Sequence, residues 1–450
     1  MPVAAQPDGS FWAPYAWIDP VVERDVLITV ADGRITAVTP DSGPAPAGAT
    51  VLTGLALPGM ANAHSHAFHR ALRGNVQVGS GTFWTWRDTM YRVADRLDPD
   101  SYLELATAVY AEMALAGITA VGEFHYLHHA PGGVRYADPN AMGEALIEAA
   151  ARAGIRITLL DTCYLSAGFG EAPNQHQQRF SDGDADAWAA RAAELKPRAH
   201  ARVGAAVHSV RAVPADQLAT VAGWTDQRRA PLHVHLSEQV AENEGCLAAH
   251  GVTPTQLLAE HGVLGPRTSA VHATHLTDAD ISLLAATSTV ICMCPTTERD
   301  LADGIGPAHR LAHDGCRISL GSDSHAVVDP FEEARALELN ERLATQRRGH
   351  WTAAALLRAA TEDGHASIGW SDSGRLAAGA LADLCTIALD TPRTAGPDAG
   401  LGAETAVFAA GAADVRDVVV GGRVVVRDGV HTTVPSVGAA LAKAIAAVTG

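Results

Sequence analysis

The chain has very little lysine and no paired cysteine motif. Its 33 Lys and Arg residues include only two lysines, Lys196 and Lys443. The six cysteines are scattered and show no Cys-x-x-Cys spacing, which indicates a reducing compartment and no disulfide framework. Cys292 and Cys294 are two residues apart and could share a metal ion, but we expect both to be apolar core residues.

Long apolar runs and an excess of positive charge are also absent. No segment approaches the roughly 20 apolar residues of a membrane helix, and Met1–Asp8 lacks the basic start and apolar stretch of a secretory signal. The formal net charge of −17 argues against nucleic acid or an anionic membrane as a partner. We therefore expect a cytoplasmic protein in which any anionic substrate is held by a local cluster of cations.

Both ends of the chain have a β-rich pattern, whereas the middle alternates. Strand-like runs lie between 16 and 38 and return at 384–388 and 418–426, where Gly421-Gly422 permits a two-residue hairpin turn. The middle alternates short apolar runs with Ala-rich helical stretches at 101–116, 139–153, 184–195, 215–222 and 332–346. This pattern predicts an α/β fold with a (β/α)8 barrel of the TIM type over 58–375. A small β-sandwich-like module would combine 1–57 with 376–450, the second part also carrying a terminal helix.

Histidine and aspartate residues at the ends of apolar runs indicate a metal site. His64-Ser65-His66 follows such a run, and residues i and i+2 of a strand face the same side. His235, His272 and Asp323 also lie where an apolar stretch meets a polar loop, the position from which a β/α barrel supplies its catalytic side chains. Singly, His235 could be a core histidine and Asp323 a helix N-cap. Together they predict a zinc site with one open position for water, held by His64, His66, His235 and Asp323.

Several longer strings resemble a known enzyme family. They are residues 64–68 (HSHAF), 83–87 (FWTWR), 123–129 (EFHYLHH), 208–213 (HSVRAV) and 321–324 (GSDS). Together they resemble the mononuclear deaminase branch of the amidohydrolase superfamily, and in particular the formimidoylglutamate deiminases of histidine degradation. The similarity spans about 50 to 430 and implies one zinc ion per chain, a homodimer, and conversion of N-formimino-L-glutamate and water to N-formyl-L-glutamate and ammonia.

The scarcity of lysine supports the expectation of one metal ion. Many amidohydrolases hold two metal ions bridged by a carboxylated lysine from a middle strand. Here Lys196 is the only lysine before the C-terminal helix, and it stands beside Pro197, which ends a helix. A binuclear site of that kind is not expected.

Three residues are candidates for the chemistry at the metal. Glu238 follows His235 by three residues and is expected to carry protons as general acid and base. Asp323 would be both a metal ligand and the acceptor of the water proton, and His272 would orient the nucleophile or stabilise the developing charge. A Glu just past a strand is most often a solvated helix start, but its spacing from His235 favours the catalytic role.

Two arginines are candidates for binding a dicarboxylate substrate, because guanidinium groups bind carboxylates bidentately. Arg87 lies beside Trp84 and Trp86, and Arg211 follows His208 by three residues; either could instead form a surface salt bridge. By resemblance, Arg87 with Tyr126 and His69 would hold the side-chain carboxylate, and Arg211 with His208 the α-carboxylate. His69 stands where the family often has Gln, and an imidazolium there would pair with that carboxylate.

Two other functions fit part of this pattern. A deaminase of a nucleobase or related heterocycle, of the guanine or S-adenosylhomocysteine type, would share the metal ligands, Glu238 and His272, but it would need a ring pocket instead of Arg87 and Arg211 facing the metal. A metal-binding scaffold without turnover is a third interpretation, although such proteins tend to lose ligands and none of the expected ligands is missing here.

Overall fold

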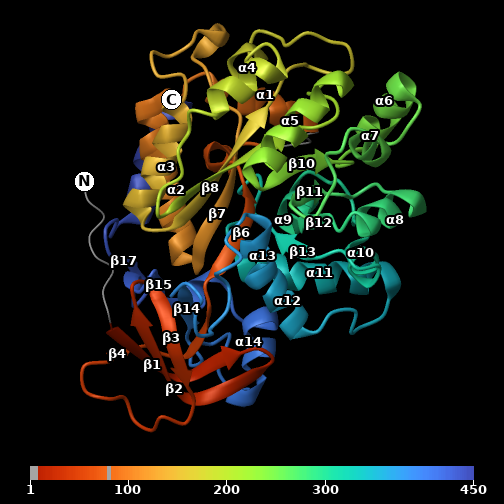
Figure 1. Cartoon of the computed structure of the whole chain (residues 1–450). Coiled ribbons are helices and arrows are strands. Elements are labelled where there is room, and N and C mark those ends of the chain that lie inside the picture. The colour runs from red at the N-terminus through yellow and green to blue at the C-terminus, as the bar shows by residue number, and fades with distance from the viewer. Residues whose placement is uncertain (1–8, 79–82) are drawn as a thin grey trace.

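Eight parallel strands form a barrel in the order in which they occur along the chain (Figure 1). The computed structural model describes residues 9–78 and 83–450. The barrel strands are β6 (Met60–Ser65), β7 (Ile118–His125), β8 (Arg156–Cys163), β9 (Ala201–Val207), β10 (Leu232–Leu236), β11 (Thr268–His272), β12 (Val290–Met293) and β13 (Ile318–Leu320). Ser65 and Asp323 meet in a parallel bridge, which brings the last strand back to the first and confirms the predicted barrel.

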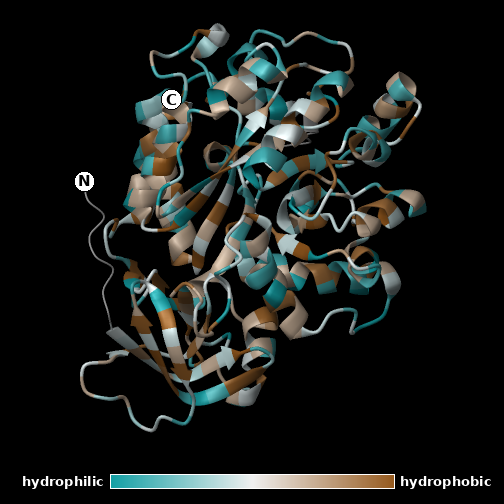
Figure 2. Cartoon of the chain, viewed as in Figure 1, coloured by the Kyte–Doolittle hydropathy of each residue, from teal (hydrophilic) through white to brown (hydrophobic). Residues whose placement is uncertain are grey.

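Helices surround the barrel between successive strands (Figure 1). They are α1 (Phe83–Ala94), α2 (Pro99–Leu115), α3 (Ala141–Ala153), α4 (Ala185–Ala192), α5 (Ala215–Arg228), α6 (Val240–His250), α7 (Pro254–Glu260), α8 (Asp278–Ala286), α9 (Pro295–Asp300), α10 (Ala308–His313), α11 (Pro330–Thr345), α12 (Ala353–Ala360) and α13 (Glu362–Ser367), with 3-10 turns η1 (Ala67–Leu72), η2 (Pro131–Gly133) and η3 (Gln177–Phe180). The five predicted helical stretches correspond to α2, α3, α4, α5 and α11. Because helices cover the barrel, its strands are buried on both faces and are rich in apolar residues, as the brown colour in Figure 2 shows.

The two ends of the chain form a separate sheet of nine strands, mostly antiparallel. It contains β1 (Gly9–Ile18), β2 (Val21–Ala31), β3 (Arg34–Thr39), β4 (Thr50–Val51), β5 (Leu55–Pro58), β14 (Leu384–Ile387), β15 (Val415–Val420), β16 (Arg423–Arg427) and β17 (Val430–His431). Antiparallel pairing of β5 with β14 joins the two ends. Gly421 and Gly422 have φ of 57° and 75°, so the predicted Gly-Gly hairpin turn between β15 and β16 is confirmed.

The C-terminal part of the chain adds helices to both the barrel and the terminal sheet. Here lie η4 (Ala399–Leu401), α14 (Gly402–Phe408), η5 (Ala412–Asp414) and the terminal α15 (Val437–Thr449), which packs against α2 of the barrel. Among the helices described, none combines the length and the apolar character needed to cross a membrane.

A buried ion pair fastens the barrel to the terminal sheet. Arg156 of β8 donates from Nε to Asp383 Oδ2 at 2.7 Å and from Nη2 to Oδ1 at 3.0 Å. Asp383 also accepts the Gly421 backbone N–H and the Ser373 hydroxyl. The Asp383 carboxylate is fully buried, and these donors compensate the loss of water around it.

Replacing Arg156 by Met is expected to lower the free energy of unfolding by about 3–5 kcal/mol, because Asp383 would remain as a buried carboxylate without its cation. Urea unfolding followed by circular dichroism measures this change. The matched control is Arg358→Met, which removes the exposed pair with Asp19 and should cost less than about 1 kcal/mol. Equal losses for the two variants would contradict the role of the buried pair.

Candidate active site

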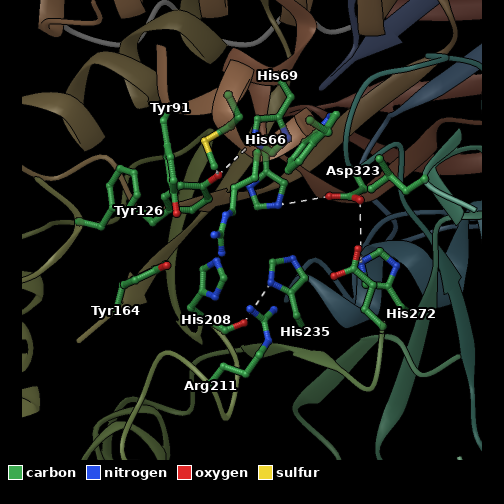
Figure 3. Close-up of a pocket in the computed structure, with 16 residues that line it drawn as sticks. His66, His69, Tyr91, Tyr126, Tyr164, His208, Arg211, His235, His272 and Asp323 are labelled. Carbon is green, nitrogen blue, oxygen red and sulfur yellow. Dashed lines mark hydrogen bonds and ion pairs between the residues drawn. The ribbon is translucent and has the colours of Figure 1, made fainter. Parts of the chain in front are cut away.

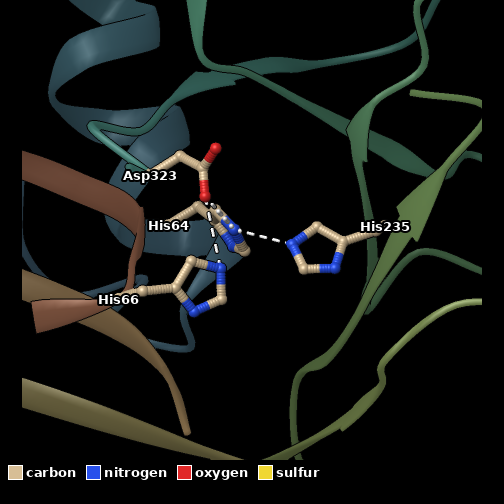
Figure 4. A group of neighbouring side chains, drawn as sticks. All are labelled: His64, His66, His235 and Asp323. Carbon is tan, nitrogen blue, oxygen red and sulfur yellow. Dashed lines mark hydrogen bonds and ion pairs between the residues drawn. The ribbon is translucent and has the colours of Figure 1, made fainter. Parts of the chain in front are cut away.

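Three histidines and one aspartate converge at the carboxyl end of the barrel (Figure 4). His64 Nε2 lies 3.1 Å from His235 Nε2, and Asp323 Oδ1 lies 3.2 Å from the Nε2 atoms of both His64 and His66. Metal–nitrogen bonds of about 2.0–2.1 Å in a tetrahedral site would separate neighbouring ligand atoms by about 3.3 Å. The predicted ligands therefore have the spacing of a tetrahedral metal site.

Hydrogen bonds on the far side of two rings prepare them for metal binding. His66 Nδ1 lies 2.9 Å from the Phe124 carbonyl, and His235 Nδ1 lies 3.0 Å from the His208 carbonyl. A carbonyl accepts only, so each Nδ1 carries the proton and each Nε2 presents its lone pair to the centre of the group. The donor set therefore fits a cation such as zinc.

Burial gives these ligands the charge states that a metal requires. It lowers the pKa of His64 to about 3 and holds the pKa of His235 well below its ordinary value, so both rings are neutral. Burial alone would raise the pKa of Asp323, but the neighbouring His64 and His66 hold that pKa well below the usual range. The group thus contains a carboxylate and the two neutral imidazoles of His64 and His235.

Strained backbone accompanies the site. Ser237, His272 and Asp323 have φ of 49°, 69° and 38°, a region that side-chain-bearing residues rarely adopt. Each follows or ends a barrel strand, where the chain turns abruptly out of the sheet. Strain of this kind collects at functional sites because the surrounding structure fixes the conformation.

His272 lies among carboxylates beside the ligand group. Its Nε2 is 3.9 Å from Glu238 Oε1 and 3.8 Å from Asp323 Oδ2, and its Nδ1 is 3.5 Å from Glu298 Oε1. Burial would lower the pKa of His272, but these carboxylates raise it well above its ordinary value. Burial also raises the pKa of Glu238. The predicted catalytic residues Glu238 and His272 therefore lie side by side next to the predicted metal ligands.

The predicted substrate residues line the same pocket (Figure 3). The pocket is lined by the predicted metal ligands His66, His235 and Asp323, by the predicted catalytic residues Glu238 and His272, and by all five predicted substrate residues: His69, Arg87, Tyr126, His208 and Arg211. Arg87 comes from α1 and Arg211 from the loop after β9, so two arginines distant in the sequence line the pocket that contains the predicted metal ligands.

The pocket also contains residues that the sequence analysis did not single out. Tyr91 and Tyr164 line it, Tyr164 accepting a hydrogen bond from Gln177 Nε2 at 2.7 Å, and the Arg87 guanidinium lies 5.7 Å from the Tyr91 ring centre. Tyr164 directly follows β8, and this place at a strand end was the signal that could have identified it. Trp86 lines the pocket as well, whereas the side chain of Trp84 lies outside the described part.

The sequence leaves the charge of His69 open, and the surroundings of its ring bear on that question. It is buried beside His66, and its Nε2 lies 3.0 Å from the Tyr126 hydroxyl. Burial holds the pKa of His69 well below its ordinary value, and the neighbouring His66 acts in the same direction. The ring is therefore a neutral hydrogen-bonding group, like the Gln found in the resembling family.

A second group of possible metal ligands has a carboxylate that is already paired. His125, His128 and Asp161 are buried close together, but the Asp161 carboxylate accepts from both Nη atoms of Arg191 and from Trp188 Nε1. Such a carboxylate belongs to an ion-pair network that holds the fold.

The remaining candidates from the sequence are not members of the predicted metal-ligand group. Cys292 and Cys294 are buried in an apolar cluster, as expected, and Lys196 is exposed and donates to the Ala193 carbonyl.

Comparison with known proteins identifies the family. The model of the amidohydrolase family matches residues 55–425. The chain is 39% identical over 417 residues to a formimidoylglutamate deiminase of Pseudomonas aeruginosa, covering 89% of this chain and 90% of the relative. It is 32% identical over 350 residues to an 8-oxoguanine deaminase of the same organism, covering 76% of each. The crystal structure of an amidohydrolase from Brucella melitensis superposes with a TM-score of 0.89 at 31% identity, covering 98% of this chain and 100% of that one. The chain thus belongs to the amidohydrolase family and is a hydrolase that acts on carbon–nitrogen bonds.

Proposed function

We propose that the enzyme binds one zinc ion per chain and hydrolyses N-formimino-L-glutamate to N-formyl-L-glutamate and ammonia, a step of histidine degradation in the cytoplasm. The observation that carries this proposal is the placement of Arg87 and Arg211 in one pocket with the metal-ligand group. A substrate that carries two carboxylates matches two separate guanidinium groups. The similarity to the Pseudomonas deiminase supports the same substrate.

The residues around the ligand group suit hydrolysis of an amidine. When bound by His64, His66, His235 and Asp323, zinc would supply Lewis-acid activation of water. In the reaction, a water oxygen forms a bond to the formimino carbon, the bond from that carbon to its terminal nitrogen breaks, and ammonia leaves. Two protons must reach the departing nitrogen, and Glu238 is placed to carry them because burial keeps its pKa raised. His272, 3.9 Å from Glu238, would stabilise negative charge that develops on oxygen.

Recognition of the two carboxylates divides between the two sides of the pocket. Arg87, Tyr126 and His69 would hold the side-chain carboxylate, with the hydrogen bond between His69 and Tyr126 keeping the two side chains next to each other. Arg211 and His208 would hold the α-carboxylate. The aromatic rings of Tyr91, Tyr164 and Phe180 line the same pocket and exclude water, which strengthens these ion pairs.

Replacing Glu238 by Gln is expected to lower kcat by about 10²- to 10⁴-fold, because the amide can neither accept nor deliver the protons that ammonia needs. Zinc content should stay at one ion per chain in both proteins, since Glu238 is outside the ligand group. Ammonia release and elemental analysis of the purified proteins measure the two quantities. A variant with wild-type kcat, or a wild type with two ions, would refute the corresponding part of the proposal.

A substrate panel tests the choice of substrate. Wild-type enzyme should release ammonia faster from formiminoglutamate than from formimino monocarboxylates, guanine, 8-oxoguanine or S-adenosylhomocysteine. Changing either Arg87 or Arg211 to Met should lower kcat/KM for formiminoglutamate about ten- to a hundredfold, through loss of one charge-assisted contact. The similarity to an 8-oxoguanine deaminase makes a neutral heterocycle the alternative substrate. Faster turnover of such a heterocycle than of formiminoglutamate would show that the proposed substrate is wrong.

The pH dependence tests the charge of His69. Since its pKa lies well below the ordinary value, its proton is already lost throughout about pH 6 to 8. The kcat/KM of the free enzyme should therefore show no decline assignable to His69 as pH rises over that range, and His69→Gln should leave the shape of the profile unchanged. If the wild type declined with rising pH and His69→Gln removed that decline, His69 would bind as an imidazolium.

A further inference from the structure

Glu242 is a buried carboxylate that contacts both Arg211 and the backbone of Ser237 but does not line the pocket. It lies in the first turn of α6, and only 1% of its surface is exposed. One oxygen, Oε2, accepts the Arg211 Nε–H at 2.8 Å, and the other, Oε1, accepts the Ser237 backbone N–H at 2.8 Å. A buried charge is stable only when it is paired and hydrogen-bonded in this way.

The contact with Arg211 fixes which edge of the guanidinium is available. A guanidinium presents five N–H donors in a planar fork. Glu242 takes the Nε–H, so the terminal Nη groups remain to receive a carboxylate from the pocket. The side chain of Arg211 is long and otherwise flexible, and the buried carboxylate holds it in one rotamer before substrate arrives.

The contact with Ser237 fixes the backbone that carries Glu238. Ser237 follows the last residue of β10, has a φ of 49°, and directly precedes Glu238. A backbone hydrogen bond at this position restrains the strained turn from which the catalytic carboxylate projects. Glu242 therefore links the donor for the substrate carboxylate to the proton carrier at the reacting carbon.

We propose that Glu242 is a positioning residue that sets the distance and orientation between the α-carboxylate of the substrate and Glu238, and so selects amidines that have a carboxylate on the carbon next to the formimino nitrogen. The inference rests on the proposed function and adds the residue that makes Arg211 specific. It acts through Arg211 and Ser237 and makes no contact with substrate.

Glu242→Gln is the sharpest variant, because it keeps the shape of the side chain and retains Oε1 for Ser237 while an NH2 group replaces the acceptor of the Arg211 Nε–H. For formiminoglutamate, kcat/KM should fall about ten- to a hundredfold, mainly through a higher KM. For 4-(formimidoylamino)butyrate, which lacks the α-carboxylate, it should change less than about threefold. A merely structural role would lower both values alike.

Two comparisons make the test specific. In an Arg211→Met background, Glu242→Gln should have no further effect on kcat/KM, because the residue through which it acts is gone. Glu244→Gln, an exposed position two residues further along α6, is the matched control and should leave both substrates unaffected. Independent, multiplying effects of Glu242→Gln and Arg211→Met would overturn the inference.

A variant at Arg211 covers the case in which Glu242→Gln does not fold. Arg211→Lys keeps the positive charge and lacks the Nε–H, so it should lose as much kcat/KM for formiminoglutamate as Arg211→Met, within about threefold. Near wild-type activity of Arg211→Lys would overturn the inference. If the wild type itself released no ammonia from formiminoglutamate, the proposed function would fail. If the wild type were active and Glu242→Gln lowered kcat/KM equally for both substrates, only the inference about Glu242 would fail.

Discussion

Hydrogen bonding between Asp323 and the first barrel strand is the interaction on which the site depends. The Asp323 backbone N–H donates to the His64 carbonyl at 3.0 Å, and its carbonyl accepts from the His66 N–H at 3.3 Å. This pairing brings the end of the eighth strand against the beginning of the barrel. It also places the Asp323 side chain between His64 and His66. The contacts that close the barrel therefore also bring Asp323 next to His64 and His66, the two predicted ligands from the first strand.

Three buried glutamates share one kind of contact: each accepts a backbone N–H just after the end of a barrel strand. Glu123 accepts the Ala67 N–H just after β6, Glu242 accepts the Ser237 N–H just after β10, and Glu298 accepts the Cys294 N–H just after β12. Each holds a backbone group at the point where a strand leaves the sheet. Each also reaches a functional neighbour: Glu123 accepts from Ser65 between two ligands, Glu242 from Arg211, and Glu298 lies near His272. At these three strand ends, a buried carboxylate from a helix or a neighbouring strand restrains the loop that follows.

A dicarboxylate such as the proposed substrate would have to bind to a chain with a net charge of −17. The two arginines that line the pocket would make this possible. Cations inside a pocket that excludes water interact more strongly with a ligand than distant surface charges do. Arg211 is compensated by Glu242, and its pKa stays raised although burial opposes this. The chain is also similar to an 8-oxoguanine deaminase. Under the proposed function, the pocket walls contributed by α1 and by the loops after β8 and β9 would therefore determine the choice of substrate.

The sequence by itself determined the fold class and the residues that the metal group needs. Apolar runs ending in His64-Ser65-His66, His235, His272 and Asp323 identified strand ends, because strand burial and chemistry at the carboxyl end of a barrel leave a local pattern. Only the tertiary structure showed that His69 is buried beside His66, that Tyr164 lines the pocket and that Glu242 contacts Arg211. Burial and the contacts of Glu242 with Arg211 arise between segments far apart in the chain, and the local pattern of Val240–His250 is that of an ordinary polar helix.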